Sequence, residues 1–225
     1  MTGKVIDTLK RATKDGAPIL LVIAGPNGAG KTTFHDHFIS PLGLPFVNAD
    51  RIAQSQSPTK KLSGKFSYEA AKIADAERRM LLVDGKSFCM ETVFSDPAGD
   101  KLKFLRTARK SGYSVILVFI GLECAELSLA RVIQRVAGGG HNVPDDKLRE
   151  RFPRSFDNLR KALSFVDHAF LFDNSSSNTP FRPVAIWESG NLHQTFHLVP
   201  AWAVPFLSVK KQVNRLRTRK SHGTK

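Results

Sequence analysis

The chain of 225 residues has little cysteine and no long apolar run. No stretch approaches the roughly 18 apolar residues that a membrane-spanning helix needs, and the N-terminus lacks the apolar core of a secretory signal. We therefore expect a cytoplasmic protein that does not bind membranes. Its two cysteines, Cys89 and Cys124, form no metal motif, and we expect both to be reduced packing residues.

Acidic residues are scarce relative to basic ones, which gives a formal net charge of +14. Residues 210–225 contain seven Lys or Arg and no acid, and so account for half of that excess. We expect one domain over residues 1–208 and a basic, disordered tail over residues 209–225. Salt-dependent attraction of this tail to RNA or DNA is the alternative interpretation. The remaining positive charge suits an enzyme whose substrates are phosphorylated.

One segment carries a strong motif. Residues 25–33 follow the apolar run 18–24 and match the Walker A pattern G-x-x-x-x-G-K-[ST], which predicts backbone N–H groups turned toward phosphates at the start of a helix. We expect Lys31 to reach the β- and γ-phosphates of ATP or GTP, and the Thr32 hydroxyl to bind Mg²⁺. The expected nucleotide-binding residues are Gly25, Pro26, Asn27, Gly28, Ala29, Gly30, Lys31, Thr32 and Thr33, with Arg131 further along the chain.

Signatures of other nucleotide-binding classes are missing. Motor and transporter ATPases carry an apolar run that ends in Asp-Glu, and transporters add Leu-Ser-Gly-Gly-Gln; neither occurs here. A phosphate loop alone does not name a reaction. One acid past the second predicted strand, one within the third, and a glycine-rich segment flanked by arginines are instead typical of a small-molecule kinase with a closing lid.

The pattern of apolar runs predicts an α/β fold. We expect a P-loop fold of the nucleotide-kinase type, with a five-stranded, mostly parallel sheet, helices on both faces and a small C-terminal β-hairpin. The predicted strands are residues 18–24, 46–47, 87–94, 113–120 and 169–172, and the predicted hairpin joins residues 184–187 to 192–196. Residues 54–66 predict a loop before a long helix. His35 and His37 are expected to be exposed on a helix and to bind no ligand.

Two acids are candidates for the chemistry. Asp50 follows the second strand, where ligand crevices form in open α/β sheets, and could accept the proton of an acceptor hydroxyl. A turn-capping or water-mediated Mg²⁺ role is its alternative. Glu91, in the third strand, could hold a substrate hydroxyl or a Mg²⁺-bound water, or could simply pair with a neighbouring Arg or Lys. Arg51 could bind a phosphate of the acceptor or form a surface salt bridge.

The predicted lid, residues 131–152, carries arginines on both sides of its glycines. Arg131 and Arg135 precede the glycines of residues 138–140 and share one helix face, since they are four positions apart. Arg149 and Arg151 follow the glycines but point about 200° apart on a helix, so we expect only one to serve, and we favour Arg151. Closing of the lid could bring both groups over the triphosphate. A solvated helical face is the alternative interpretation of this arginine group.

At these motifs the chain resembles the zeta toxin family of P-loop kinases, in its compact, chromosomally common branch. The resemblance covers about residues 18–172, and the lid is its most specific part. The matching segments are Gly25–Thr33, Val47-Asn-Ala-Asp50, Glu91-Thr92, Arg131-Val-Ile-Gln-Arg135, Gly139-Gly-His-Asn-Val-Pro144, Arg151-Phe152 and Asn158-Leu159.

The resemblance implies transfer of the γ-phosphate of ATP or GTP, with Mg²⁺, to the 3′-hydroxyl of the amino sugar in a UDP-N-acetyl sugar. It implies Asp50 as base, Lys31 as phosphate-loop lysine, and Arg135 and Arg151 as γ-phosphate ligands. Glu91 would be the strand acid, with Thr92 beside it in the substrate site. It also implies a small antitoxin protein as partner.

Two other functions stay open at this point. The positive charge is compatible with a nucleic-acid-associated NTPase or a polynucleotide 5′-hydroxyl kinase. A nucleotide-dependent binding module without catalysis would also carry the phosphate loop.

Overall fold

The computed structural model describes residues 16–56, 64–138 and 143–207, together with residues 3, 6, 7, 10 and 11. The predicted basic tail and the lid residues 139–142 lie outside the described residues. No helix within the described ranges combines the length and the apolar character needed to span a bilayer.

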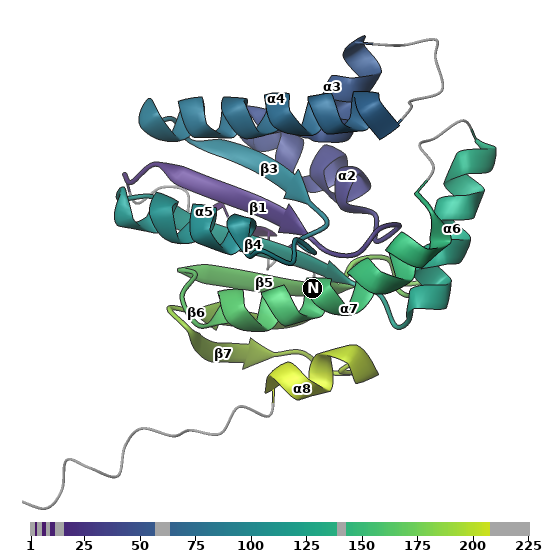
Figure 1. Ribbon diagram of the computed structural model, residues 1–225. Helices are drawn as coiled ribbons and strands as arrows, with labels where there is room; N and C mark the ends of the chain where they lie inside the picture. Colours follow the sequence, from purple (N-terminus) through teal and green to yellow (C-terminus); the bar gives the residue numbers. More distant parts are fainter. Residues whose placement is uncertain are drawn as a thin grey trace, which may run out of the picture.

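A single sheet of seven strands forms the centre of the fold, in the order β2-β3-β1-β4-β5-β6-β7 (Figure 1). The strands are β1 (Ile19–Ala24), β2 (Phe46–Val47), β3 (Phe88–Thr92), β4 (Ser114–Gly121), β5 (His168–Asp173), β6 (Arg182–Glu188) and β7 (Asn191–Thr195). The first five strands pair in parallel, so their carboxyl ends meet at one edge of the sheet.

The predicted C-terminal hairpin exists, but it is not a separate element. Strand β6 pairs antiparallel with β5, and β7 pairs with β6, so the sheet has seven strands rather than five. The five central residues of β6, from Pro183 to Trp187, are all buried. Because a lone two-stranded ribbon would leave such residues in water, the hairpin is stable only as an extension of the main sheet.

The helices largely follow the predicted pattern. They are α2 (Lys31–Phe34), continued by η1 (His35–Ile39) and η2 (Ser40–Leu42), then α3 (Ala49–Gln56), α4 (Gly64–Val83), α5 (Asp100–Lys110), α6 (Ala125–Ala137), α7 (Asp145–Leu163), and η3 (Ala201–Ala203) running into α8 (Val204–Leu207). The predicted loop over residues 54–66 is wrong at both ends, since α3 extends to Gln56 and α4 already begins at Gly64.

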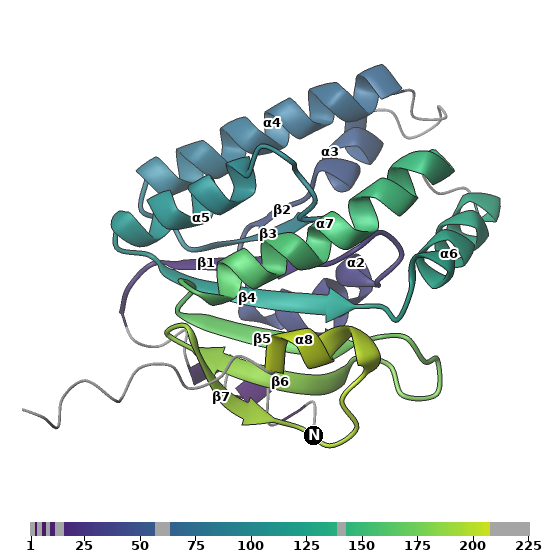
Figure 2. The same cartoon turned by 60° about the horizontal axis from the view of Figure 1, so that its bottom comes forward.

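Helices cover both faces of the sheet, as predicted. Helices α4, α5, α7 and α8 pack on one face and α2 with η1 on the other, as Figures 1 and 2 show. Alternate residues of β1 serve the two cores: Leu20 and Val22 face the first group, and Leu21 and Ile23 the second. The strands whose carboxyl ends meet at one edge of the sheet are therefore buried on both faces.

Both cysteines are free thiols, as expected from the sequence. Cys89 lies within β3 and is fully buried. Burial, and next the negative charge of Glu91, raise the pKa of the Cys89 thiol well above its ordinary value.

Tyr113 supplies a stability test of the packing between α4 and the sheet. It is 3% exposed, and its hydroxyl donates to the carbonyl oxygen of Leu81 at 2.9 Å. We expect Tyr113→Phe to lower the free energy of unfolding by about 1 kcal/mol, because the Leu81 carbonyl keeps the backbone N–H of Lys86 as donor but loses the buried hydroxyl. Urea unfolding measures this change, with Tyr68→Phe, at a 62% exposed position, as the matched control. Equal midpoints for the two variants would contradict the prediction.

Candidate active site

The phosphate loop connects β1 to α2 and is packed too tightly for side chains at its glycines. Gly25 has φ +144°, and a Cβ there would lie 2.2 Å from the carbonyl oxygen of Ile120 at the end of β4. Gly30 has φ +87°, and a Cβ there would lie 2.8 Å from the amide nitrogen of Asn174. The two glycines of the motif are thus required by backbone conformation and by close neighbours.

Lys31 lies at the centre of the charged groups of the site. It is 6% exposed, and its ammonium donates to the carbonyl oxygen of Pro26 at 2.9 Å. Burial lowers the pKa of Lys31; the charges of Glu91 and Asp50 act in the opposite direction, and the charge of Arg135 lowers it further. Three predicted site residues from three different elements therefore lie within electrostatic range of one ammonium group.

Glu91 joins the phosphate loop to the second strand. Its Oε2 accepts hydrogen bonds from the Thr32 hydroxyl at 2.8 Å and from the side-chain amide of Asn48 at 2.7 Å. Its Oε1 lies 4.0 Å from the Lys31 ammonium. Glu91 thus contacts the two phosphate-loop residues expected to bind phosphate and Mg²⁺.

Asn48, to which the sequence analysis assigned no role, fixes the helix that carries Asp50. It is 4% exposed, and its side-chain oxygen accepts from the backbone N–H groups of Asp50 at 2.8 Å and Arg51 at 3.2 Å. It therefore caps α3 while its amide holds Glu91. An Asn directly before a helix was the available sequence signal. Asp50 itself is exposed at the start of α3.

Arg51 is held by the helix that follows the phosphate loop. Its guanidinium pairs with Asp36 at 2.5 Å and lies over the ring of Phe46, with 4.9 Å between Cζ and the ring centroid. The ring of His35 stacks on Phe46, 3.5 Å between centroids. His35 is 4% exposed, so the prediction that it is exposed is wrong; this stack removes it from water. The salt-bridge alternative for Arg51 is the one that these contacts support.

Helix α6 packs against the tip of the phosphate loop. The Ser128 hydroxyl donates to the carbonyl oxygen of Asn27 at 2.7 Å, and the Arg131 guanidinium contacts the carbonyl oxygen of Ser175 at 3.4 Å. A Cβ on Gly28 would lie 3.1 Å from the Cβ of Arg131. Arg131 is thus beside the loop that it was predicted to assist.

The lid arginines have different surroundings. Arg135 lies one helical turn beyond Arg131 and close enough to Lys31 to affect its pKa. Arg149 is paired with Glu126 of α6 at 2.7 Å, which uses its charge to join α6 and α7. Arg151 is half-buried on α7. Thr92, predicted beside the acceptor, accepts a hydrogen bond from the backbone N–H of Phe94 at 3.0 Å.

The segment after β5 also touches the phosphate loop, which the sequence analysis missed. The amide nitrogen of Asn174 donates to the carbonyl oxygen of Ala29 at 2.9 Å, and its oxygen accepts from the backbone N–H of Phe181 at 3.3 Å. Asn174 directly follows a parallel strand, and that position was the available signal. Its carboxamide therefore fixes the phosphate loop from the side of β5.

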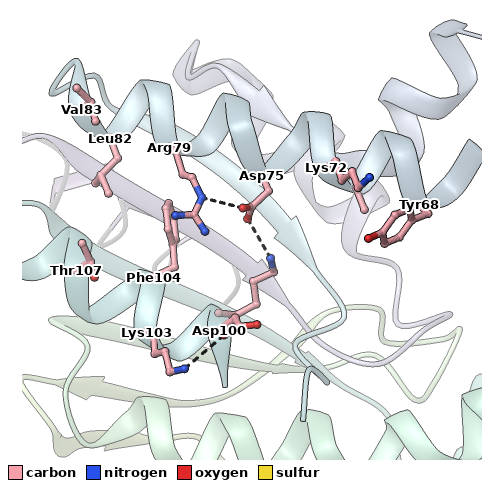
Figure 3. Close-up of a pocket in the computed structure, with 12 residues that line it drawn as sticks. Tyr68, Lys72, Asp75, Arg79, Leu82, Val83, Asp100, Lys103, Phe104 and Thr107 are labelled. Atoms are coloured by element: carbon pink, nitrogen blue, oxygen red, sulfur yellow. Dashed lines mark hydrogen bonds and ion pairs between the residues drawn. The ribbon is translucent and has the colours of Figure 1, made fainter. Parts of the chain in front are cut away.

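A hollow of about 880 Å³ lies elsewhere, between α4 and α5 (Figure 3). No phosphate-loop residue lines it. Its charged groups pair with one another: Asp75 with Arg79 at 2.8 Å and Lys101 at 3.5 Å, and Asp100 with Lys103 at 3.6 Å. We therefore assign the site to the phosphate-loop edge rather than to this hollow.

Comparisons with known proteins address the fold and the family. A protein of Haemophilus influenzae, itself uncharacterised, is 27% identical over 128 residues, which cover 57% of this chain and 88% of that protein. Among solved structures, the AvrRxo1-ORF1:-ORF2 complex with ATP has a TM-score of 0.61 at 20% identity, covering 85% of this chain and 67% of that one.

The PezAT chromosomal toxin–antitoxin system of Streptococcus pneumoniae has a TM-score of 0.56 at 19% identity, over 82% of this chain and 80% of that one. At such identities these structures establish a shared fold and no more. The family described as Zeta toxin matches residues 4–182, which is most of the chain. The chain therefore belongs to the zeta toxin family.

Proposed function

We propose that the protein is a Mg²⁺-dependent kinase that transfers the γ-phosphate of ATP or GTP to a hydroxyl group of a small metabolite. The observation that carries this proposal is the set of charges around Lys31, to which Glu91, Asp50 and Arg135 all contribute. A triphosphate on the phosphate loop, an acid beside its terminal phosphate and an arginine above it are the parts that phosphoryl transfer requires.

Nucleotide binding follows from the loop geometry. Lys31 is a buried cation whose pKa is lowered mainly by burial, and a bound phosphate would supply the compensating negative charge. Asn174 and Ser128 hold the backbone carbonyl groups of Ala29 and Asn27, so the loop is fixed from two sides. A loop fixed in this way loses less conformational freedom when it binds a triphosphate.

The residues present suit Mg²⁺ that arrives with the nucleotide. The described residues contain no group of three or more His, Cys, Asp or Glu that could hold a metal by themselves. The Thr32 hydroxyl, 2.8 Å from the Glu91 carboxylate, provides one oxygen ligand beside one acid. This fits Mg²⁺, which keeps several waters and takes few protein ligands. When bound, the ion would neutralise charge on the β- and γ-phosphates.

In the proposed reaction, the acceptor hydroxyl transfers its proton to the Asp50 carboxylate. The acceptor oxygen forms a bond to the γ-phosphorus while the bond between that phosphorus and the β,γ-bridging oxygen breaks, and the nucleoside diphosphate leaves. Arg135 and Arg151 neutralise the oxygens of the transferred group. Asn48 orients Asp50, because it caps the first turn of the helix on which Asp50 lies.

The acceptor and the partner are the finer part of the proposal. Family membership supports a UDP-N-acetyl sugar as acceptor, phosphorylated on the 3′-hydroxyl of its amino sugar, with Glu91 and Thr92 beside it. The solved toxin–antitoxin system of Streptococcus pneumoniae supports a small antitoxin protein as partner of this chain.

The first prediction concerns Asp50. We expect Asp50→Asn to lower the rate of phosphate transfer by roughly 10²–10⁴-fold, because the acceptor loses its proton acceptor, while nucleotide affinity stays near that of the wild type. The measurement uses γ-labelled ATP, Mg²⁺ and a panel of UDP-sugars. Asp84→Asn, at an exposed position in the turn directly after α4, is the matched control. Wild-type label that stays in ATP and free phosphate with every acceptor would overturn the proposed function, and an unimpaired Asp50→Asn would overturn the role of this residue.

The second prediction separates the two roles of Asn48. Asn48→Asp keeps the oxygen that caps α3 but replaces the amide that donates to Glu91, whereas Asn48→Ala removes both contacts. We expect Asn48→Asp to transfer phosphate no faster than Asn48→Ala, because two carboxylates then face each other. Steady-state rates and urea midpoints measure the effects. Wild-type rates in Asn48→Asp would show that only the cap matters.

The third prediction addresses the nucleic-acid alternative, which the net charge of +14 favours. Deletion of residues 210–225 removes half of that charge. We expect turnover with the small acceptor to be unchanged. Binding of labelled RNA and DNA is measured over a salt series before and after the deletion. Loss of turnover together with loss of salt-dependent binding would favour the polynucleotide kinase.

A further inference from the structure

The segment after β3 turns sharply next to the site. Phe94 has φ +61°, a left-handed conformation that costs a non-glycine residue free energy, and it is only 1% exposed. The Thr92 hydroxyl accepts from the backbone N–H of Phe94 on one side of the turn. The strained turn lies three residues beyond Glu91, so its position determines where the end of β3 lies.

Helix α7 holds this turn through two buried side chains. The Ser155 hydroxyl donates to the carbonyl oxygen of Val93 at 2.7 Å. The side-chain amide of Asn158 donates to the carbonyl oxygens of Phe94 at 3.0 Å and Asp96 at 3.2 Å. Ser155 is 0% exposed and Asn158 is 4% exposed. Three hydrogen bonds to carbonyl groups within residues 93–96 therefore fix α7 against the segment that follows β3.

Arg151 lies on the same face of α7 as these two residues. At about 100° per residue, positions 151, 155 and 158 fall within about 60° of one another around the helix. Arg151 lies about 6 Å along the axis from Ser155, which is within the length of an arginine side chain. The helix face that contacts the end of β3 is thus also the face that carries Arg151, one turn closer to the N-terminus of α7.

Pro153 makes the two contacts necessary. It lies inside α7 between Arg151 and Ser155, and a proline there removes the helical hydrogen bond to the carbonyl oxygen of residue 149. The Ser155 hydroxyl, which donates to Val93, also lies 3.1 Å from the carbonyl oxygen of Arg151 in this turn. Arg149 joins the first turns of α7 to α6, and Ser155 and Asn158 fix the helix on the other side of the proline.

We propose that Ser155 and Asn158 are positioning residues that set Arg151 over the γ-phosphate by fixing α7 to the end of β3. This inference rests on the proposed function. It assigns a distinct task to the two ends of α7: the part after Pro153 is fixed on the strand that carries Glu91, and the part before it carries the arginine.

The test is a double-mutant cycle in the full-length protein, with Ser155→Ala, Asn158→Ala and Arg151→Ala alone and in pairs. The probe is γ-labelled ATP with UDP-N-acetylglucosamine, and ATP hydrolysis without acceptor is measured in parallel. We expect each positioning variant to lower kcat roughly ten- to a hundredfold, with the KM for ATP nearly unchanged. In the Arg151→Ala background, we expect neither variant to lower kcat further.

Two controls separate positioning from loss of stability. Ser164→Ala removes a hydroxyl that donates to the carbonyl oxygen of Lys161 at the exposed end of the same helix, and should leave kcat unchanged. Thermal melting shows which variants are folded. If Asn158→Ala does not fold, the cycle is carried out with Ser155→Ala, which removes a single donor.

The inference would be overturned if Ser155→Ala or Asn158→Ala lowered kcat by the same factor with and without Arg151→Ala. The two residues would then act independently of the arginine. A wild-type protein that hydrolyses ATP but labels no acceptor would instead overturn the proposed function. In that case the double-mutant cycle is evaluated with the kcat values for ATP hydrolysis.

Discussion

The carboxylate of Glu91 is the interaction on which the site depends. It accepts hydrogen bonds from Thr32 and Asn48 and faces the Lys31 ammonium. Lys31 and Thr32 follow β1 and Asn48 follows β2, so the carboxylate joins two strand connections, and the Thr32 and Asn48 side chains would lose this acceptor without it. One side chain therefore sets the distance between the phosphate side of the site and the helix that carries Asp50.

The strand order makes this convergence possible. Because β3 lies between β1 and β2, its carboxyl end is adjacent both to the phosphate loop and to the start of α3. On the other side of β1, β4 leads into the arginine-bearing helix α6 and β5 leads into Asn174. Strands β2 and β3 therefore lie on one side of β1, and β4 and β5 lie on the other. Ligand crevices in open α/β sheets form where the strand order changes direction in this way.

The sequence was sufficient for features that depend on local spacing. The phosphate-loop motif and the apolar runs predicted the parallel strands and most of the helices, and the position of Asp50 after the second strand predicted that it would lie at the ligand crevice. Contacts between distant residues could not be predicted in this way. The hydrogen bond from Asn48 to Glu91 spans 43 positions, and that from Asn174 to Ala29 spans 145.

Other misses have equally physical reasons. The polar composition of residues 54–56 concealed the end of α3, a helix that is stabilised by its cap and by packing on α4. His35 was predicted to be exposed, but it stacks on Phe46, which a helical pattern alone cannot show. The hairpin was recognised by its turn, whereas its pairing with β5 depends on which sheet edge remains open after the first five strands have assembled.

The burial of Cys89 has a consequence for how the molecule opens. Cys89 lies in β3 two residues before Glu91, and its side chain packs in the core on the face covered by α2 and η1. An alkylating reagent reacts with the thiolate form, which this environment strongly disfavours, so the folded chain protects the thiol both sterically and electrostatically. Alkylation of this thiol therefore reports how often the core between β3 and the helices α2 and η1 opens to solvent.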